Sequence, residues 1–284
     1  LEITLNNGRC KGIQLGPKTG ELEELDSMEK IFEAYKKQME YFVRHLAQAD
    51  NAVDYAHMER APLPFMSALV DDCISVGKSV QEGGAIYNFT GPQAFGVADS
   101  GDSLYAIKKN VFDDKKMTLL ELKKALEANF GYSDEIQPAK CNTKTPGAMS
   151  EADIYEAVKK ILTNTGSIDI ATLENKLTSQ LSNNSCASAK CCGEETGRFA
   201  TIRKILQTTE TFGNDIDEVD DIARRCGKIY CDEVDKYMNP RGGQFQAGIY
   251  PVSANVLFGK DVLALPDGRL AHQPLADGVS PRQG

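Results

Sequence analysis

Residues 239–284 read NPRGGQFQAGIYPVSANVLFGKDVLALPDGRLAHQPLADGVSPRQG and show no helical period. Within them, residues 245–250 and 252–258 predict strands or extended loops, because aromatic and β-branched residues are grouped between glycine and proline. The Pro-Asp-Gly of residues 266–268 is a turn signal. The Asn-Pro-Arg-Gly-Gly of residues 239–243 ends the helix predicted before it. The segment therefore predicts a strand-and-loop region after a largely helical chain.

The helix predicted directly before this segment begins in a dense acidic cluster. Apolar residues recur at helical spacing from Val219 to Tyr237. A calcium-binding loop needs a glycine at its sixth position and a distal glutamate, which this spacing does not supply. Carboxylates near a helix N-terminus are stabilised by the helix dipole. We therefore interpret the cluster as a solvated helix start rather than a metal site; it comprises Asp215, Asp217, Glu218, Asp220 and Asp221.

The N-terminal half is predicted to be mostly helical. Residues 1–5 favour a short strand before the Asn-Asn-Gly turn signal at residues 6–8. A long helix is predicted over residues 27–61, because its apolar residues follow the helical period and two prolines follow it. Asp26 and Glu29 are placed to form its N-terminal cap.

Two further helices, residues 65–80 and 97–112, are predicted on either side of an extended segment at residues 83–93. Thr118 and Glu121 have the spacing of a capping box, in which each side chain bonds the backbone N–H of the other residue. Another helix is therefore predicted to begin directly after Thr118.

Residues 133–200 have a different character from the rest of the chain. Two short helical patterns are followed by a polar, Cys-bearing loop at residues 182–196. Cys186, Cys191 and Cys192 have C-x4-C-C spacing, whereas structural zinc sites show paired C-x2-C units. We predict one partial domain over residues 1–284, with a helical surface insertion at residues 133–200.

Composition excludes several classes of function. The formal net charge of −9 argues against a nucleic-acid or anionic-membrane surface. No apolar run reaches transmembrane length. The eight cysteines mostly stand singly, which favours a reducing compartment and a cytoplasmic protein. Leu1 is followed by no signal-peptide pattern, so we expect an internal piece of a longer protein.

No catalytic constellation is visible from spacing. The three histidines, His45, His57 and His272, are scattered, and no nucleophile elbow, phosphate loop or dinucleotide fingerprint is present. Patterns alone therefore predict a helix-rich α/β protein and nothing more about its chemistry.

Four stretches resemble the catalytic subunits of glycyl radical enzymes of the pyruvate formate-lyase type. They are LEITLNNG at residues 1–8, GGAIYNFTGPQAFGVADSGDSLYAIKK at 83–109, FGNDIDEV at 212–219, and the whole of 239–284. The resemblance is to the branch that holds glycerol and propanediol dehydratases, choline lyase, hydroxyproline dehydratase and arylacetate decarboxylases. Residues 133–200 take no part in it.

This resemblance implies an α/β fold, part of a ten-stranded barrel surrounded by helices, of which the chain would hold roughly the second half. It also implies a radical lyase or dehydratase that acts on a small organic substrate. In the family an activating enzyme with an iron–sulfur cluster and S-adenosylmethionine installs a glycyl radical. The glycyl radical passes its spin to a cysteine, and the resulting thiyl radical takes a hydrogen atom from the substrate.

The two radical-bearing motifs of the family are absent. The active cysteine is expected in a G-C-x-E type motif before Leu1, and the radical glycine in an R-V-x-G-Y type motif after Gly284. Cys231 is followed by Asp232 and Glu233 and so has the Cys-x-Glu spacing, but Tyr230 stands before it in place of the glycine that the motif requires. We therefore assign no catalytic residue and no metal or cofactor ligand, and expect this polypeptide alone to be inactive.

The resemblance does imply that residues 250–256 form part of the wall of the substrate pocket. In the family the matching segment runs through the barrel near the active cysteine, and Tyr250 is the foremost candidate to face the substrate. Val252 and Val256 also fit simple core positions. Leu257 stands where relatives commonly carry proline, which leaves the path of the segment open. The predicted substrate-binding residues are Tyr250, Val252, Ser253, Ala254, Asn255 and Val256.

Several functions remain open at this point. An arylacetate decarboxylase of the 4-hydroxyphenylacetate type is one alternative, because that branch tends to be long and residues 133–200 lengthen this chain. A diol dehydratase is equally supported, and a non-catalytic truncated or assembly chain is a third reading. Cys191 and Cys192 are not the adjacent pair of pyruvate formate-lyase, because they lie in the insertion. The implied partners are the activating enzyme, a small substrate and further copies in a dimer or higher oligomer.

Overall fold

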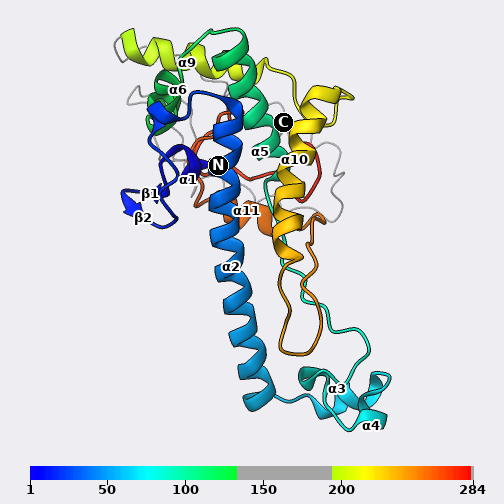
Figure 1. Cartoon of the computed structure of the whole chain (residues 1–284). Coiled ribbons are helices and arrows are strands. Elements are labelled where there is room, and N and C mark those ends of the chain that lie inside the picture. Colours follow the sequence, from blue (N-terminus) through cyan, green and yellow to red (C-terminus); the bar gives the residue numbers. More distant parts are fainter. Residues whose placement is uncertain (133–193, 283–284) are drawn as a thin grey trace, which may run out of the picture. The chain divides into compact units, whose positions relative to one another are not determined.

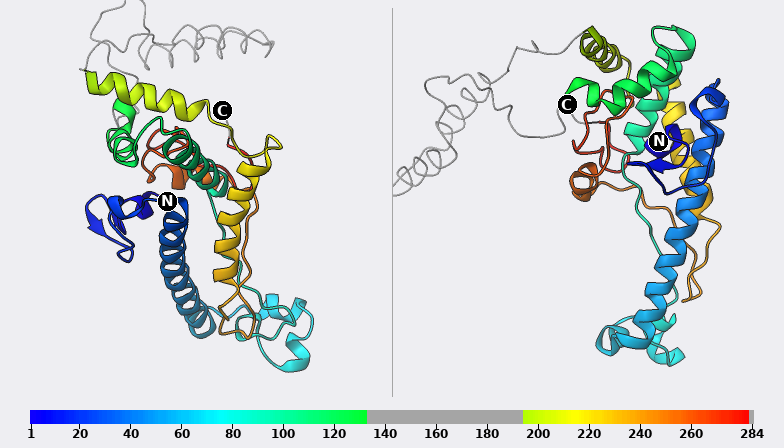
Figure 2. Two further views of the ribbon diagram at one scale, coloured as in Figure 1. Left: turned by 45° about the horizontal axis from the view of Figure 1, so that its top comes forward. Right: turned by 90° about the vertical axis from the view of Figure 1, so that its left-hand side faces the viewer.

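Three helices carry the core of the protein: α2 (Met28–Arg60), α5 (Val97–Ile107) and α10 (Asp217–Val234). The structure is a computed structural model and describes residues 1–132 and 194–282 (Figure 1). Helix α10 packs against both α2 and α5, and α2 and α10 run side by side in both Figure 1 and Figure 2. At the α5–α10 crossing, a Cβ atom on Gly101 would lie 2.7 Å from Cβ of Ala223. Only glycine allows so close an approach.

Shorter elements surround these helices. Helices α6 and α9 pack against each other, and α9 also contacts the turn η4. The remaining elements are α1 (Glu2–Leu5), β1 (Arg9–Cys10), β2 (Ile13–Gln14), η1 (Leu22–Glu24), α3 (Pro64–Leu69), α4 (Cys73–Val76), η2 (Val80–Glu82), the π-helical η3 (Lys108–Asp113), α6 (Leu119–Glu127), η4 (Asn129–Gly131), α9 (Glu194–Gln207) and α11 (Ala254–Gly259).

The main hydrophobic core joins elements that are distant in sequence. Leu104 and Ile107 of α5, Leu122 of α6, Ile202 of α9 and Val219 of α10 are all fully buried in it. Burial of such side chains stabilises the fold by about 1.5–3 kcal/mol each. This core fixes α5 and α10, which in turn support the C-terminal segment.

Strand pairing is limited within the described residues. Strands β1 and β2 form one antiparallel hairpin, with Cys10 opposite Ile13. Two isolated parallel bridges join Thr90 to Phe245 and Gln93 to Gly248. The described part of the chain is therefore rich in helix, with one two-stranded sheet and a short parallel contact, and it does not display a ten-stranded barrel.

The strongly periodic predictions are confirmed. Helices α2, α5 and α10 fall where the apolar period places them, and residues 83–93 are extended apart from a turn at their start. The capping box also forms: Thr118 Oγ1 accepts from the backbone N–H of Glu121 at 3.1 Å, and Glu121 Oε2 accepts from that of Thr118 at 2.8 Å. Of the acidic residues predicted at the start of α10, Asp217, Glu218 and Asp220 lie in its first turn, and Asp215 precedes the helix.

Two predictions near the N-terminus are wrong. Residues 1–5 form the helical turn α1 rather than a strand, because the N–H of Gly8 bonds the carbonyl of Ile3 and closes the turn back on itself. The cap of α2 is not formed by Asp26 and Glu29. Asp26 instead accepts from Lys30 Nζ at 2.7 Å, and Glu29 pairs with Arg225 at 2.7 Å.

Two further predictions of regular structure are corrected. The helix predicted over residues 65–80 is divided into α3 and α4, because Val70 is extended and Asp72 is left-handed with φ 72°. The strand or extended loop predicted over residues 252–258 is replaced from Ala254 onward by helix α11. Helix α9 begins at Glu194, inside the predicted loop. The predicted helices and cysteine cluster of the insertion lie outside the described residues.

Candidate functional site

The predicted wall residues form one continuous surface segment, in which some side chains are exposed and others are buried. Residues 250–252 are extended, Ser253 precedes α11, and the helix carries Ala254, Asn255 and Val256. Tyr250 is 59% exposed and Val256 44% exposed, whereas Asn255 is 8% exposed. Tyr250 and Val256 are therefore available to a ligand, and the Asn255 side chain is not.

The position of Tyr250 is fixed through its backbone. Gln93 Nε2 donates to the Tyr250 carbonyl oxygen at 2.5 Å. The bridge between Gln93 and Gly248 holds the preceding residues, with a 2.8 Å bond from the Gly248 N–H to the Pro92 carbonyl. The Tyr250 hydroxyl makes no hydrogen bond to any residue that the structure describes. The backbone at Tyr250 is thus held in place, while its hydroxyl has no partner in the described part of the chain.

Asn255 fastens α11 to the segment that follows it. Its Nδ2 donates to the Leu275 carbonyl at 2.7 Å, and the Leu275 N–H returns a bond to the Asn255 carbonyl at 3.3 Å. Phe258 packs on Phe95 with ring centroids 4.9 Å apart. These contacts give Asn255 a structural role within the predicted wall.

A cluster of buried charges lies behind this segment. Asp99 and Asp102 on α5 are 1% and 2% exposed, and Asp267 is 2% exposed. Asp99 accepts from the Ala276 N–H at 2.6 Å, and Asp102 accepts from the Phe212 N–H at 2.6 Å. Each carboxylate therefore anchors a loop to α5.

Asp267 is held by a backbone N–H on one side and by a guanidinium on the other. Its Oδ1 accepts from the Arg269 backbone N–H at 2.9 Å, and its Oδ2 lies 3.1 Å from Arg282 Nη1. Arg282 also donates to the Asp267 carbonyl, and that bond is better aligned than the ion pair. One oxygen each of Asp99 and Asp102 has no hydrogen-bond partner among the described residues.

Burial changes the acidity of these groups. Burial, followed by the charge of Asp267, raises the pKa of Asp99 to about 6. Burial likewise raises the pKa of Asp102 to about 7, against the lowering effect of the Phe212 N–H. Burial also raises the pKa of Asp267, which Arg282 partly offsets. The cluster therefore holds protons at a pH where an exposed aspartate is ionised.

A family model described as Pyruvate formate lyase-like matches residues 1–259. The chain belongs to this family of glycyl radical enzymes. The crystal structure on 1,2-propanediol dehydration in Roseburia inulinivorans is similar at 42% identity and TM-score 0.76, covering all of this chain and 28% of that one. The glycerol-bound B12-independent glycerol dehydratase from Clostridium butyricum is similar at 43% identity and TM-score 0.74, with the same coverages.

A dehydratase is also similar to this chain in sequence. Trans-4-hydroxy-L-proline dehydratase of Clostridioides difficile is 30% identical over 286 residues, which cover 100% of this chain and 28% of the relative. The chain thus spans little more than a quarter of the length of the relatives it matches. Within the described residues no helix is both long and apolar enough to cross a membrane.

The motifs shared with glycyl radical enzymes meet in the buried charge cluster. Asp99 and Asp102 come from the stretch at residues 83–109, Phe212 begins the third stretch, and Asp267 belongs to the last. Sequence reasoning missed these roles. A signal was present, because two aspartates at i and i+3 share one face of an otherwise small and apolar helix.

The described cysteines, Cys10, Cys73, Cys226 and Cys231, are free thiols. Burial raises the pKa of the Cys226 thiol to about 12, so it stays protonated. His45 packs edge-on against Tyr41 with centroids 4.4 Å apart. In residues 1–132 and 194–282 no group of three or more His, Cys, Asp or Glu side chains is arranged so that it could hold a metal ion.

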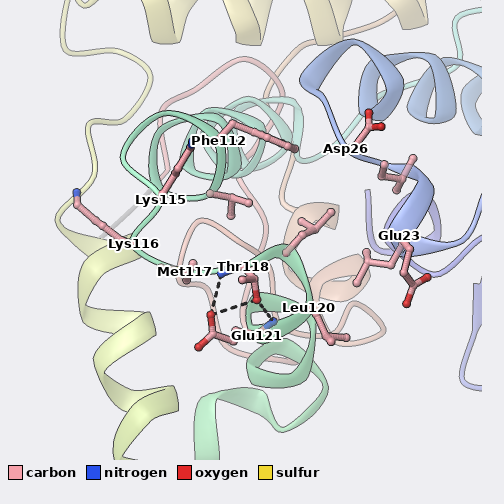
Figure 3. A pocket seen from close by; sticks show the side chains of 13 residues that line it. Glu23, Asp26, Phe112, Lys115, Lys116, Met117, Thr118, Leu120 and Glu121 are labelled. Carbon is pink, nitrogen blue, oxygen red and sulfur yellow. Dashed lines mark hydrogen bonds between the residues drawn. The ribbon is translucent and has the colours of Figure 1, made fainter.

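One cavity of the described residues lies away from the wall segment. It has a volume of about 510 Å³ and lies between residues 22–26 and residues 111–121. Figure 3 shows Lys115 on one side and Glu23 on the other, with the Thr118 capping box below. No residue of the predicted wall lines it, so its size does not make it the substrate site.

Proposed function

We propose that this chain is part of a glycyl radical enzyme that dehydrates a small vicinal diol. The observation that carries the proposal is its similarity, over its whole length and at 42–43% identity, to two structures concerned with diol dehydration. The radical glycine and the active cysteine would lie elsewhere in the longer polypeptide.

Residues 250–256 would form one wall of the substrate pocket. The Tyr250 hydroxyl can donate a hydrogen bond to a substrate oxygen, and the lack of a hydrogen-bond partner for it among the described residues supports that role. Ser253 would add a second polar contact. Val252, Ala254 and Val256 would limit the size of the substrate, and Asn255 would hold α11 in place through Leu275.

The complete protein would contain the ten-stranded α/β barrel of the family. The parallel bridges between residues 90–93 and residues 245–248 support this, because parallel neighbours from distant segments are what a barrel of that kind requires. Residues 133–200 would be a surface insertion on residues 1–284 of one partial barrel domain.

We further propose a cytoplasmic enzyme that depends on a radical S-adenosylmethionine activating enzyme and forms a homodimer or higher oligomer. The activating enzyme, and not this chain, would carry the iron–sulfur cluster. The net charge of −9 supports partners other than nucleic acid or anionic lipid. The decarboxylase alternative rested on the length of residues 133–200, of which residues 133–193 lie outside the described residues, so the structure gives it no support.

The test is activity of the full-length parent protein, activated anaerobically by its activating enzyme. Glycerol, 1,2-propanediol, choline, hydroxyproline and arylacetates would be offered separately, with products identified by mass spectrometry and the radical by paramagnetic resonance. We expect water loss from a diol to give an aldehyde. Release of carbon dioxide from an arylacetate, or a stable radical with no diol consumed, would contradict the proposal. An open reading frame with stops at both ends would instead favour a non-catalytic chain.

A further inference from the structure

Arg269 is a buried cation whose side chain bonds only to backbone. It is 4% exposed. Its guanidinium donates to the carbonyls of Gly259 at 2.8 Å, Leu263 at 2.9 Å and Pro274 at 3.3 Å, with further bonds to Val262 at 3.5 Å and to Gln273. A guanidinium has five N–H donors, so these acceptors satisfy it.

All of these acceptors lie at the last residue of α11 or in the loop that follows it. Gly259 is the last residue of that helix, and the other four carbonyls come from the next fifteen residues. No acceptor belongs to α2, α5 or α10. Arg269 therefore ties the loop to itself and to α11, rather than joining the core helices.

The charge of Arg269 is balanced at longer range. Arg269 forms no ion pair within the described part of the chain. Asp99, Asp267 and Glu2 are the acidic groups close enough to offset its burial. Glu2 also accepts from the Leu263 N–H at 3.1 Å, which fixes the loop from the N-terminal side.

Asp99 connects this loop to α5. It accepts from the Ala276 N–H, and the neighbouring Leu275 exchanges two bonds with Asn255 of α11. A short path thus runs from α5 through residues 275–276 to the helix that carries Val256. Asp102, one turn away and equally buried, bonds Phe212 instead and has no such path.

We propose that Arg269 and Asp99 are positioning residues that set the place of α11 and thereby the size of substrate accepted. This inference rests on the proposed wall role of residues 250–256. Lysine cannot replace Arg269, because one ammonium cannot reach carbonyls spread around a planar guanidinium. Asp102 serves as the matched control, since it shares the helix, charge and burial of Asp99.

The first experiment measures hydrogen exchange in the full-length, unactivated protein. Arg269→Lys and Asp99→Ala are expected to speed amide exchange in residues 255–259 by tenfold or more, while the matched Asp102→Ala leaves it within twofold of wild type. If either variant fails to fold, Asn255→Ala replaces it, because it removes the donor to Leu275 without adding a charge. Unchanged exchange in α11, or an equal rise in Asp102→Ala, would overturn the proposal.

The second readout is substrate selectivity of the activated enzyme. The ratio of kcat/KM for 1,2-propanediol to that for its four-carbon homologue is expected to fall at least fivefold in Arg269→Lys, and to stay constant in Asp102→Asn. If exchange in α11 rises but wild type consumes no diol, the proposed function fails and the positioning role stands. If wild type consumes diols and neither exchange nor the ratio changes, the positioning role fails alone.

Discussion

The helix pair α5–α10 and the segment of residues 239–282 are held by different forces. The helices meet through buried apolar side chains and the close contact at Gly101. The segment contains one six-residue helix. It buries Phe245 and Ala264, but its loops are tied together by polar side chains that bond backbone, from Asn255, Arg269 and Asp99. Damage to the first should therefore destroy the fold, whereas damage to the second should change the shape of the proposed wall.

The largest effect is expected when the chain of residues 1–284 is made alone. Phe65, Ile74 and Tyr87 are 79%, 74% and 78% exposed, and the bridged segments 90–93 and 245–248 have open edges. We expect aggregation or a broad, non-cooperative melt by size-exclusion chromatography and calorimetry. A sharp cooperative melt of a monomer would show that the helix core and the segment are sufficient by themselves.

A substitution at the helix crossing comes next. Gly101→Leu in the full-length protein places a side chain where Ala223 already lies, so overpacking should cost about 3 kcal/mol or more and prevent soluble expression. Gly197→Ala is the control, because nothing lies within 4 Å of the added Cβ atom. Equal melting temperatures for the two variants would contradict the claim that the close apolar packing of α5 against α10 is needed for the fold.

The buried acids should make stability depend on pH. The pKa of Asp99 is raised to about 6 and that of Asp102 to about 7, so the folded state binds protons that the unfolded state releases. Stability is then fully present below about pH 4 and is lost as pH rises towards 7, by up to about 1.4 kcal/mol per pH unit for each group.

Thermal melts of the full-length protein between pH 5 and pH 8 test this sign. The melting temperature of wild type should fall as pH rises, and Asp102→Asn should flatten part of that slope because its neutral amide keeps an acceptor for Phe212. A melting temperature that rises with pH in wild type, or an unaltered slope in the variant, would contradict the assignment.

The smallest expected effect is at Tyr250. Tyr250→Phe removes one hydroxyl that bonds nothing in the described residues, so the melting temperature should not change. Loss of one hydrogen bond to substrate should lower kcat/KM for the diol about tenfold, or about 1.4 kcal/mol. Tyr55→Phe is matched in exposure, at 58% against 59%, and should leave kcat/KM unaltered.

The same contrast explains what sequence could predict. The apolar period placed α2, α5 and α10, and local chemistry placed the Thr118–Glu121 capping box. Residues 1–5 were wrongly predicted as a strand and residues 252–258 as a strand or extended loop. The bond from the Gly8 N–H to the Ile3 carbonyl closes the first segment into a turn, and the bond of Asn255 to Leu275 holds the second as a helix; periodicity indicates neither bond. The family motifs supplied the wall residues, but no local pattern indicates that Tyr250 faces outward while Asn255 faces inward.

The most direct test of the central claim is a crystal structure of the full-length parent with glycerol or 1,2-propanediol bound. The account predicts that the Tyr250 hydroxyl lies about 3 Å from a substrate oxygen, with Val256 in contact with the substrate carbons. A diol bound out of reach of residues 250–256, with Tyr250 covered by another part of the protein, would contradict it.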